Sequence, residues 1–457
     1  MTLPAELVVA AQIALQELTL FAAFGFLLLG IGDLAVDLLW IGIRLRRRLR
    51  RGPSHDTLAP PATPGPIAVF IPAWDESAVI GAMLDHAISA FGDADYRLYV
   101  GCYPNDPATI EAVEARAGPR VRCVTGSTPG PTSKADCLNR LWDAMRVDEA
   151  RAGRRFKAVV LHDAEDIVHS AELRLFDSLV ERFDLVQLPV LPLIDRRSRW
   201  IGAHYADEFA EAHGKELVVR EALGAAVPSA GVGCAIARDA LDRMAAAYGT
   251  PFDPASLTED YELGLRLGAM GRPATFVRVA AGPGRPSVAT RGYFPSRIGA
   301  AVNQKARWMV GIALAGWDRL GWAGGFTERW MRMRDRQSLL AAVLLLAAYG
   351  ALLLWTALAL VWLAGGPPPP SPSPGLALLL SINLGLLGWR LAMRAGFVTR
   401  AYGWREGLRS LPRVVVGNAI AMLAARRALM LYLMLRRTGA APWNKTAHVF
   451  PRELPAE

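Results

Sequence analysis

The sequence predicts an α/β domain, built on a mostly parallel sheet, that is joined to membrane-spanning and interfacial α-helices. Three observations support this fold class. Short apolar runs alternate with helical patterns between residues 67 and 191, as in a sheet whose two faces are covered by helices. Long apolar segments lie toward both ends of the chain. A dense block of arginines follows the first of these segments, which is typical of the cytoplasmic end of a spanning helix.

The composition limits the classes of function. With 457 residues, 52% of them apolar, the chain has room for one catalytic domain and several membrane anchors. The net charge of +9 does not indicate nucleic-acid binding, because much of it belongs to the arginine block, which is first of all a topology signal. The four cysteines lack the spacing of a zinc site or a disulfide framework, so free thiols are expected. The arginines of the block are Arg44, Arg46, Arg47, Arg48, Arg50 and Arg51, and the cysteines are Cys102, Cys123, Cys137 and Cys234.

Residues 1–53 are predicted to form an N-terminal transmembrane anchor. The apolar stretch 18–43 is long enough to cross roughly 30 Å of hydrocarbon at about 1.5 Å per residue. The arginine block after it places the N-terminus outside and the following chain in the cytoplasm. Asp33 and Asp37 lie one helical turn apart, at a depth similar to that of Arg390 in a later span. We favour an ion pair that holds the anchors together, with a functional intramembrane carboxylate as the alternative.

A proline-rich linker, residues 54–66, leads into a cytoplasmic domain predicted over residues 67–295. In open parallel sheets, ligands bind beyond the carboxyl ends of the strands, and polar residues follow three of the predicted strands in that position. The predicted strands are 67–72, 98–102, 121–124, 158–161 and 185–191, and the predicted helices include 77–91 and 134–145. The polar residues are Asp75 and Glu76, then Asn105 and Asp106, then a cluster that includes Asp163.

This cluster, from His162 to Asp166, places carboxylates directly after a buried strand. No glycine-rich phosphate loop follows the first strand, so carboxylates at a phosphate site would require a divalent cation. Oxygen ligands suit Mg²⁺ or Mn²⁺. A cation held by Asp163, Glu165 and Asp166 would bridge diphosphate oxygens and neutralise the charge of a leaving group. The alternative is a solvated acidic turn, and His162 itself is expected to pack or hydrogen-bond.

The segment Ser256-Leu257-Thr258-Glu259 fits a helix capping box, and the helix is predicted over residues 261–270. In that interpretation Glu259 closes the cap, and Asp260 favours the positive end of the helix dipole. A carboxylate at a helix start that faces a cleft also suits a general base that takes a proton from a hydroxyl group. Because the acidic cluster precedes it, we favour the catalytic interpretation.

Residues 296–337 are predicted to form interfacial helices. Gln304 and Trp308 share a helix face, and Arg307 is the neighbour of Trp308. One interpretation is a membrane-surface helix with aromatic and basic anchors. The other uses Trp308 as a flat platform for a sugar ring and Arg307 as a partner for a diphosphate. The two are compatible at a site on the membrane surface.

A transmembrane hairpin is predicted over residues 338–396, with an external proline-rich turn at 365–374. The last segment, 397–457, is predicted to contain an interfacial or re-entrant helix and a cytoplasmic tail. Its apolar stretch 414–435 would place two adjacent arginines, 426 and 427, near mid-bilayer if it crossed the membrane, at a cost of at least a few kcal/mol each. We therefore favour the interfacial position over a further span.

Taken together, Asp75-Glu76, Asp163-Ala164-Glu165-Asp166, Thr258-Glu259-Asp260 and Gln304-x-x-Arg307-Trp308 resemble the motifs of the processive membrane glycosyltransferases of family 2. Cellulose, hyaluronan and chitin synthases belong to that family. The resemblance covers residues 67–322 and the hairpin, and it implies a GT-A domain with a Rossmann-like mixed sheet. The chain departs from the usual Asp-x-Asp at Glu165, and it has fewer predicted spans than is usual. Segments 103–107 and 443–451 are similar to a narrower group, the inner-membrane subunits of a bacteriophage receptor.

The resemblance implies a role for each motif residue. Asp260 would be the catalytic base, with Glu259 beside it, and residues 231–234 would face the acceptor. Either Mg²⁺ or Mn²⁺ would be the cofactor. The implied nucleotide-sugar-binding residues are Asp75, Glu76, Asp106, Lys134, Asp163, Gln304, Arg307 and Trp308, and the implied metal ligands are Asp163, Glu165 and Asp166.

The implied activity is an inverting transfer of a sugar from a UDP-sugar to an acceptor hydroxyl at the bacterial inner membrane, in the synthesis of an exopolysaccharide or surface glycan. The expected partners are the UDP-sugar, a growing glycan or lipid-linked acceptor, membrane lipid and an outer-membrane export protein, with no nucleic acid. Two alternatives stay open. One is a single transfer to a lipid-linked acceptor, and the other is a receptor or secretion scaffold that keeps the fold without catalysis.

Overall fold

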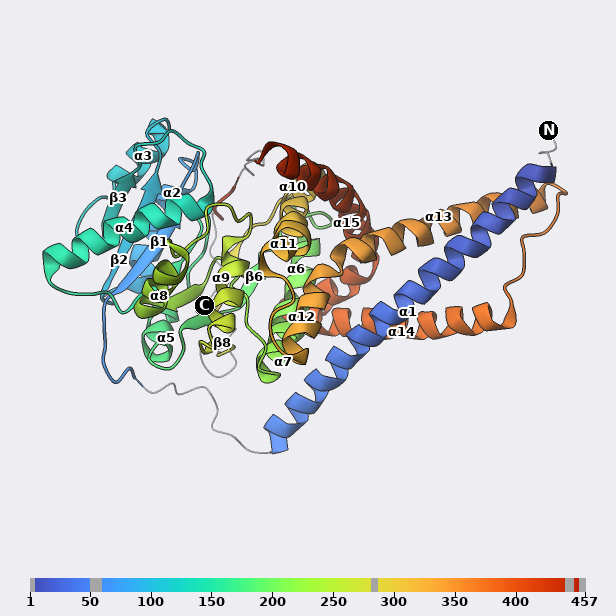
Figure 1. Ribbon diagram of the computed structural model, residues 1–457, viewed down its shortest axis with the longest axis horizontal. Helices are drawn as coiled ribbons and strands as arrows, with labels where there is room; N and C mark the ends of the chain where they lie inside the picture. Colours follow the sequence, from blue (N-terminus) through green and yellow to red (C-terminus); the bar gives the residue numbers. More distant parts are fainter. Residues whose placement is uncertain (1–4, 50–59, 281–286, 440–447, 452–457) are drawn as a thin grey trace.

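The computed structural model describes residues 5–49, 60–280, 287–439 and 448–451. An α/β domain lies at one side of the molecule, and long helices project from it on the other side (Figure 1). The predicted arginine block and the tail segment 443–451 fall partly outside the described residues.

A seven-stranded mixed sheet forms the centre of the α/β domain. Strands β1 to β4 are parallel, β7 runs antiparallel between β4 and β5, and β8 is parallel to β5. Both faces of β1 are covered, which explains why this strand reads as a continuous apolar run. In spatial order the strands are β3 (Val121–Thr125), β2 (Tyr96–Cys102), β1 (Ile67–Pro72), β4 (Ala158–Leu161), β7 (Cys234–Ala237), β5 (Leu185–Gln187) and β8 (Ala274–Phe276).

The strand predicted over residues 185–191 is two strands in two sheets. β5 ends at Gln187, and β6 (Val190–Pro192) pairs with β9 (Thr290–Gly292) in a separate two-stranded sheet. Pro189 stands between the two strands, and proline has no N–H to donate to a continuous ladder. The prediction of a single strand was therefore wrong, because the chain changes sheets at this proline.

Helices pack on the sheet at the positions that the alternating pattern predicts. The helix predicted over 77–91 begins later, at Ile80, and the one predicted over 134–145 continues to Ala152. It ends at Gly153, whose φ of 61° is the left-handed conformation that commonly terminates helices. The helices of this domain are α2 (Ile80–Phe91), α3 (Pro107–Glu114), α4 (Lys134–Ala152), α5 (Glu172–Leu179), α6 (Ala203–Glu211), η1 (Ala212–Glu216), α7 (Leu217–Ala222), α8 (Arg238–Tyr248) and α9 (Glu259–Ala269).

Within the described residues, four helices are long and apolar enough to cross a membrane: α1, α13, α14 and α15. Figure 1 shows α1, α13 and α14 extending together away from the α/β domain. Shorter helices, α10 to α12, lie between this group and the sheet. Their bounds are α1 (Ala5–Leu49), α10 (Ile298–Met309), η2 (Val310–Leu314), α11 (Ala315–Leu320), α12 (Phe326–Arg336), α13 (Ser338–Leu363), α14 (Pro374–Tyr402) and α15 (Trp404–Thr438).

The two carboxylates of α1 fasten it to other elements, as the sequence predicts. Asp33 lies 2.8 Å from the guanidinium of Arg390 in α14 and 3.0 Å from that of Arg334 in α12. One turn further along, Asp37 lies 2.6 Å from Lys215 Nζ in η1. The predicted pairing between Asp33 and Arg390 is confirmed, and the second carboxylate joins the first anchor to the α/β domain.

Helix α15 lies beside α10 and curves along the edge of the α/β domain (Figure 1), and it also packs against α13 and α14 where these reach the domain. Ile420, Ala424 and Ala428 are fully buried in this contact region. The side chain of Arg413 is also buried and lies 2.7 Å from Asp207 of α6. These contacts support the predicted interfacial position of α15, although its length and hydropathy are also sufficient for a span.

Candidate active site

The carboxyl ends of β1 and β2 bring two of the predicted nucleotide-binding carboxylates together. The backbone N–H of Asp75 donates to Asp106 Oδ2 over 2.6 Å, and Asp75 has a φ of 53°. The other oxygen of Asp106 accepts from Thr109 N–H and caps α3. Thr109 also accepts from the backbone of Glu76 at 3.0 Å. Asp106 therefore shapes the turn that presents Asp75, a structural role that the sequence did not suggest.

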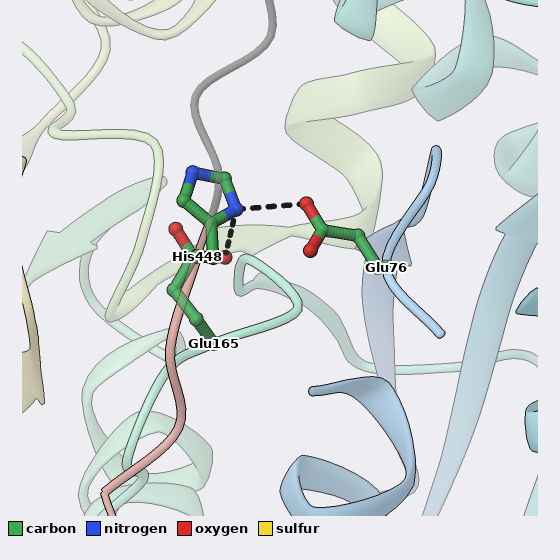
Figure 2. A group of neighbouring side chains, drawn as sticks. All are labelled: Glu76, Glu165 and His448. Carbon is green, nitrogen blue, oxygen red and sulfur yellow. Dashed lines mark hydrogen bonds and ion pairs between the residues drawn. The ribbon is translucent and has the colours of Figure 1, made fainter. Parts of the chain in front are cut away.

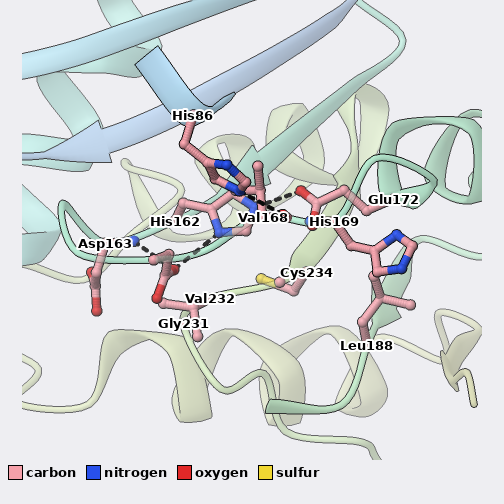
Figure 3. Close-up of polar contacts among 12 residues, drawn as sticks. His86, His162, Asp163, Val168, His169, Glu172, Leu188, Gly231, Val232 and Cys234 are labelled. Atoms are coloured by element: carbon pink, nitrogen blue, oxygen red, sulfur yellow. Dashed lines mark hydrogen bonds and ion pairs between the residues drawn. The ribbon is translucent and has the colours of Figure 1, made fainter. Parts of the chain in front are cut away.

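The acidic cluster after β4 is held by a buried histidine (Figure 3). His162 Nε2 lies 2.6 Å from Glu172, and its Nδ1 lies 3.0 Å from Asp166 Oδ2. The same oxygen of Asp166 accepts from Asp163 N–H. Burial lowers the pKa of His162, but the two carboxylates outweigh it and raise the pKa to about 10. His162 is thus a buried cation, and Asp166, a predicted metal ligand, has one carboxylate oxygen bound to it inside the fold.

Lys134, which begins α4, lies between the acidic cluster of Asp163 and the segment that contains Gly231. Its Nζ lies 2.6 Å from Asp163 Oδ1. It also donates to the carbonyl of Gly231 at 3.5 Å. Gly231 has a φ of 74°, and a Cβ at this position would collide with the carboxylate of Asp260. One small region therefore contains Lys134, Asp163 of the acidic cluster, Gly231 of the segment expected to face the acceptor, and the predicted base Asp260. These residues come from separate parts of the sequence.

Lys134, Glu259 and Asp260 have perturbed pKa values in this region. Burial lowers the pKa of Lys134, but Asp163, Glu259 and Asp260 outweigh it and raise the pKa. Burial also raises the pKa of Asp260, against the effect of Lys134. Glu259 has its pKa raised to about 7 by burial and by the charge of Asp260. Carboxylates with raised pKa values beside a lysine are a pattern that clusters at functional sites.

The predicted capping box before α9 is not formed. The helix begins at Glu259 with Thr258 as N-cap, so Glu259 is the first helical residue, and the Thr258 side chain makes no capping hydrogen bond. Asp260 Oδ1 instead accepts from the N–H of Tyr261 at 2.8 Å. Ser256 instead donates to Glu262 at 2.7 Å. The capping interpretation of Glu259 was therefore wrong, because the buried Glu262 takes the serine hydroxyl. Asp260 does lie in the first turn, where the helix dipole favours a negative charge.

Trp308 of α10 lies in an aromatic group and lines the same cavity as Asp260. Its ring centroid is 6.0 Å from that of Tyr205, and Phe209 and Phe294 complete the group. The cavity has a volume of about 450 Å³ and extends from Asp260 and Trp308 to Asp33 and Arg390 of the long helices. Its lining thus connects the predicted base with the membrane anchors.

Gln304 and Arg307 of the Gln304-x-x-Arg307-Trp308 motif lie on α10 with Trp308. Gln304 and Arg307 are both half-buried. Among the described residues, Gln304 Oε1 is a buried oxygen without a hydrogen-bond partner. A buried amide oxygen of this kind is available to a ligand, since buried polar groups otherwise find partners. Their predicted contacts with a donor diphosphate and an acceptor sugar stay predictions.

His448, for which the sequence predicted no role, forms a cluster with Glu76 and Glu165. His448 Nδ1 lies 2.8 Å from Glu76 Oε1 and 3.2 Å from Glu165 Oε2 (Figure 2). Burial raises the pKa of Glu165 to about 8, with Asp163, Asp166 and Glu76 adding and His448 opposing. The sequence did offer a hint of this contact, because His448 lies in segment 443–451, whose similarity to a group of relatives was noted without a role for His448.

The residues at this position fit a divalent cation. Within the described chain, Glu165 Oε2 is a buried oxygen that accepts no hydrogen bond, and its contact is the ion pair with His448. The ligand atoms of Glu76, Glu165 and His448 all lie within 4.8 Å of one another. Carboxylate oxygens suit Mg²⁺ and Mn²⁺, and imidazole is compatible with transition metals such as Mn²⁺.

This fold and site define the class of protein. Residues 64–311 match glycosyltransferase-like family 2, and the chain belongs to that family. Its mixed sheet and helices confirm the predicted GT-A class, joined to membrane helices.

Two relatives narrow the similarity from the family to a particular kind of protein. The chain is 38% identical over 460 residues to bacteriophage adsorption protein B of Escherichia coli K12 and, equally, to bacteriophage N4 adsorption protein B of Escherichia coli O157:H7. Each alignment covers 92% of this chain and 60% of the relative, so the chain spans about 60% of the length of these relatives. The predicted similarity to subunits of a bacteriophage receptor is confirmed.

A solved structure shows the same fold over most of the chain. The mannosyltransferase PcManGT from Pyrobaculum calidifontis, in complex with GDP-mannose and Mn²⁺, superposes with a TM-score of 0.51. The match covers 92% of this chain and 99% of that protein. At 18% sequence identity the likeness concerns the fold alone.

Proposed function

We propose that this protein is a membrane-bound inverting glycosyltransferase that moves a sugar from a UDP-sugar to an acceptor hydroxyl, with Asp260 as the base. One observation carries the proposal. Asp260 lies beside the pair of Lys134 and Asp163 and lines the cavity that contains Trp308. A proton acceptor, a charged site for a diphosphate and an aromatic platform for a sugar are thus adjacent.

The chemistry follows from this arrangement. Asp260 accepts the proton of the acceptor hydroxyl as its oxygen bonds to the anomeric carbon of the donor. The bond from that carbon to the phosphate oxygen breaks, and the nucleoside diphosphate leaves with the electron pair. Lys134 lies where it would stabilise the negative charge of the diphosphate. A bound Mg²⁺ or Mn²⁺ supplies further neutralisation of that charge. The raised pKa of Asp260 suits a base, since a stronger conjugate base takes the proton more readily.

The cavity supports an acceptor on the membrane side of the base. It extends from Trp308 to Asp33 and Arg390, two residues of the long helices. A growing glycan or a lipid-linked acceptor that occupied it would present its hydroxyl to Asp260. We propose synthesis of a surface glycan or exopolysaccharide at the bacterial inner membrane, with membrane lipid around the helices and an outer-membrane protein for export.

A second candidate is favoured by the names of the relatives, which are bacteriophage adsorption proteins. In this alternative the chain is a receptor or secretion scaffold. The two candidates are compatible if a glycan made at this site is what a bacteriophage adsorbs to. Retention of Lys134, Asp163 and Asp260 in one cluster supports catalysis over a scaffold alone.

Nucleotide release tests the proposal. The purified protein in detergent is given Mn²⁺ and a panel of UDP-sugars, with GDP-mannose for comparison, and wild type is compared with Asp260→Asn. We expect turnover to fall by about 10²- to 10⁴-fold while donor binding is retained, because the variant loses the proton acceptor and keeps the shape. Asp239→Asn is the control, because Asp239 pairs with Arg155 away from the site. Unchanged turnover in Asp260→Asn would refute the base, and no release from any donor would favour the scaffold.

A further inference from the structure

The segment 448–451 lies against the α/β domain, far along the chain from the residues that it contacts. Phe450 packs against the main hydrophobic core, with its ring centroid 6.2 Å from that of His86. Pro451 is buried. On this anchored segment, His448 points at the carboxylates of Glu76 and Glu165 (Figure 2). The tail therefore places an imidazole at the predicted metal site.

The three side chains have the spacing of ligands around one ion. Neighbouring ligands of an octahedral ion with bonds of about 2.1 Å lie about 3.0 Å apart. His448 Nδ1 lies 2.8 Å from Glu76 Oε1 and 3.2 Å from Glu165 Oε2. The side chain of His448 is 23% exposed and that of Glu165 is 14% exposed, so part of the cluster is accessible. This accessible part leaves room for a further oxygen ligand from a substrate.

Two of the residues expected to bind the metal are engaged elsewhere. Asp166 has one oxygen bound by His162 and by Asp163 N–H. Asp163 has one oxygen paired with Lys134. Glu165 remains, with a buried oxygen that accepts no hydrogen bond among the described residues. The available ligand set is thus centred on Glu165.

We propose that His448 is a ligand of the divalent cation, together with Glu76 and Glu165, so that the C-terminal segment completes the metal site of the α/β domain. This inference rests on the proposed function, because the cation is the one that assists departure of the diphosphate. It moves Glu76 from nucleotide contact to metal ligation. It also predicts that metal binding requires segment 448–451 to be packed against the α/β domain. The competing arrangement is a plain ion pair that a cation would displace.

Electron spin echo spectroscopy of bound Mn²⁺ separates these arrangements. The full chain in detergent is loaded with Mn²⁺ alone, without a sugar donor. We expect the wild type to show a ¹⁴N coupling from a directly bound imidazole. His448→Ala should lose this coupling and bind Mn²⁺ at least about 10-fold more weakly, since loss of even an outer-shell partner costs 10- to 100-fold. His204→Ala is the control and should keep the coupling, because His204 lies in α6, where it packs against Tyr205.

Several outcomes would overturn the inference. They are a wild type that binds no Mn²⁺ or shows no ¹⁴N coupling, a coupling that persists in His448→Ala, and Mn²⁺ affinity in that variant that is unchanged or higher. The last result would identify an ion pair that competes with the metal. Thermal unfolding in EDTA checks that each variant is folded, and His448→Gln replaces the alanine variant if that one does not fold.

A change of metal preference gives independent support. His448→Cys should bind Cd²⁺ more tightly relative to Mn²⁺ than the wild type does, because thiolate prefers soft ions. An unchanged preference would contradict ligation. Asp260→Asn should lose turnover and keep the ¹⁴N coupling. If no donor is turned over but the coupling is present and depends on His448, the metal inference stands and the proposed transfer fails.

Discussion

At the scale of single residues, burial decides which charged groups support the fold and which stay available for chemistry. His162 is fully buried between Asp166 and Glu172, and their charges offset its desolvation. Lys134 has the same kind of balance, but it and Asp163 keep part of their surface exposed. Buried charges of this kind are retained only where they are paired. The partly exposed pair of Lys134 and Asp163 is accessible to a ligand, whereas the enclosed His162 holds the turn after β4.

His213 is a buried histidine whose ring has no carboxylate partner within the described residues, and it should make the stability of the fold depend on pH. It is buried in η1, and its Nδ1 accepts from the N–H of Val190. Burial, with a contribution from Arg278, lowers its pKa to about 3. The unfolded chain has a pKa of about 6.5, so between these values the unfolded state binds a proton that the folded state does not. The stability due to neutral His213 is fully present above about pH 6.5 and is lost as the pH falls towards 3.

We predict that the stability advantage of wild type over His213→Gln shrinks between pH 7 and pH 5. The slope should approach about 1.4 kcal/mol per pH unit below pH 6.5. Chemical denaturation in detergent at several pH values measures the difference in unfolding free energy, and comparison with the variant cancels the other histidines. A difference that stays constant with pH would contradict the assignment.

At the scale of elements, α1 acts as more than an anchor. Asp33 contacts Arg334 and Arg390, and Asp37 contacts Lys215. The first pair ties α1 to two other helices, and the second ties it to the α/β domain. Side chains of α1 also line the cavity that contains Asp260. Helix α1 is therefore part of the scaffold of the candidate active site.

The two guanidiniums that contact Asp33 differ in burial, which makes an unequal effect testable. Arg334 is 8% exposed and Arg390 is 53% exposed. We predict that Asp33→Leu lowers the unfolding free energy by more than about 1 kcal/mol, because the buried guanidinium of Arg334 keeps only its longer ion pair with Glu216, at 3.6 Å. Arg390→Leu should cost less, since Asp33 keeps its ion pair with Arg334 at 3.0 Å. Chemical denaturation in one detergent compares the variants, and equal losses would show that Arg334 does not depend on Asp33.

At the scale of the whole molecule, the position of His448 constrains the topology. The hairpin of α13 and α14 returns the chain to the side on which it started. His448 then contacts Glu76 of the α/β domain, so the chain after α15 is on the same side as the chain before it. A helix that starts and ends on one side does not cross, which supports the interfacial position of α15. Gln12 of α1 contacts the carbonyl of Pro368, so the N-terminal part of α1 and the hairpin turn lie together at the opposite end.

Labelling of single cysteines tests this topology. In a Cys123→Ala background, Ser371→Cys in the turn should react with a membrane-impermeant maleimide in right-side-out vesicles. Ala152→Cys in the α/β domain and Thr438→Cys at the end of α15 should react only after permeabilisation. The other native cysteines are buried, which keeps the background low. Labelling of Thr438→Cys before permeabilisation would show that α15 crosses the membrane.

The sequence by itself determined the local features of this protein. Apolar runs placed β1 and β4 at their observed bounds, and the carboxylates that follow them lie at strand ends as expected. Asp33 and Asp37 were recognisable as a pair because helical spacing is regular. These features depend on residues close together in the chain, whose backbone geometry is predictable. The family followed from the order of the same short motifs.

Only the tertiary structure decided which groups meet. His448 and Glu76 are separated by 372 positions, and no local pattern links them. Thr258 rather than Ser256 is the N-cap residue of α9, and Ser256 donates to the buried Glu262, which also pairs with Arg266 and Arg319. Asp166 turned inward to a buried histidine. In each case the deciding quantity was the cost of burying a charge without a partner, which depends on packing between segments far apart in the sequence.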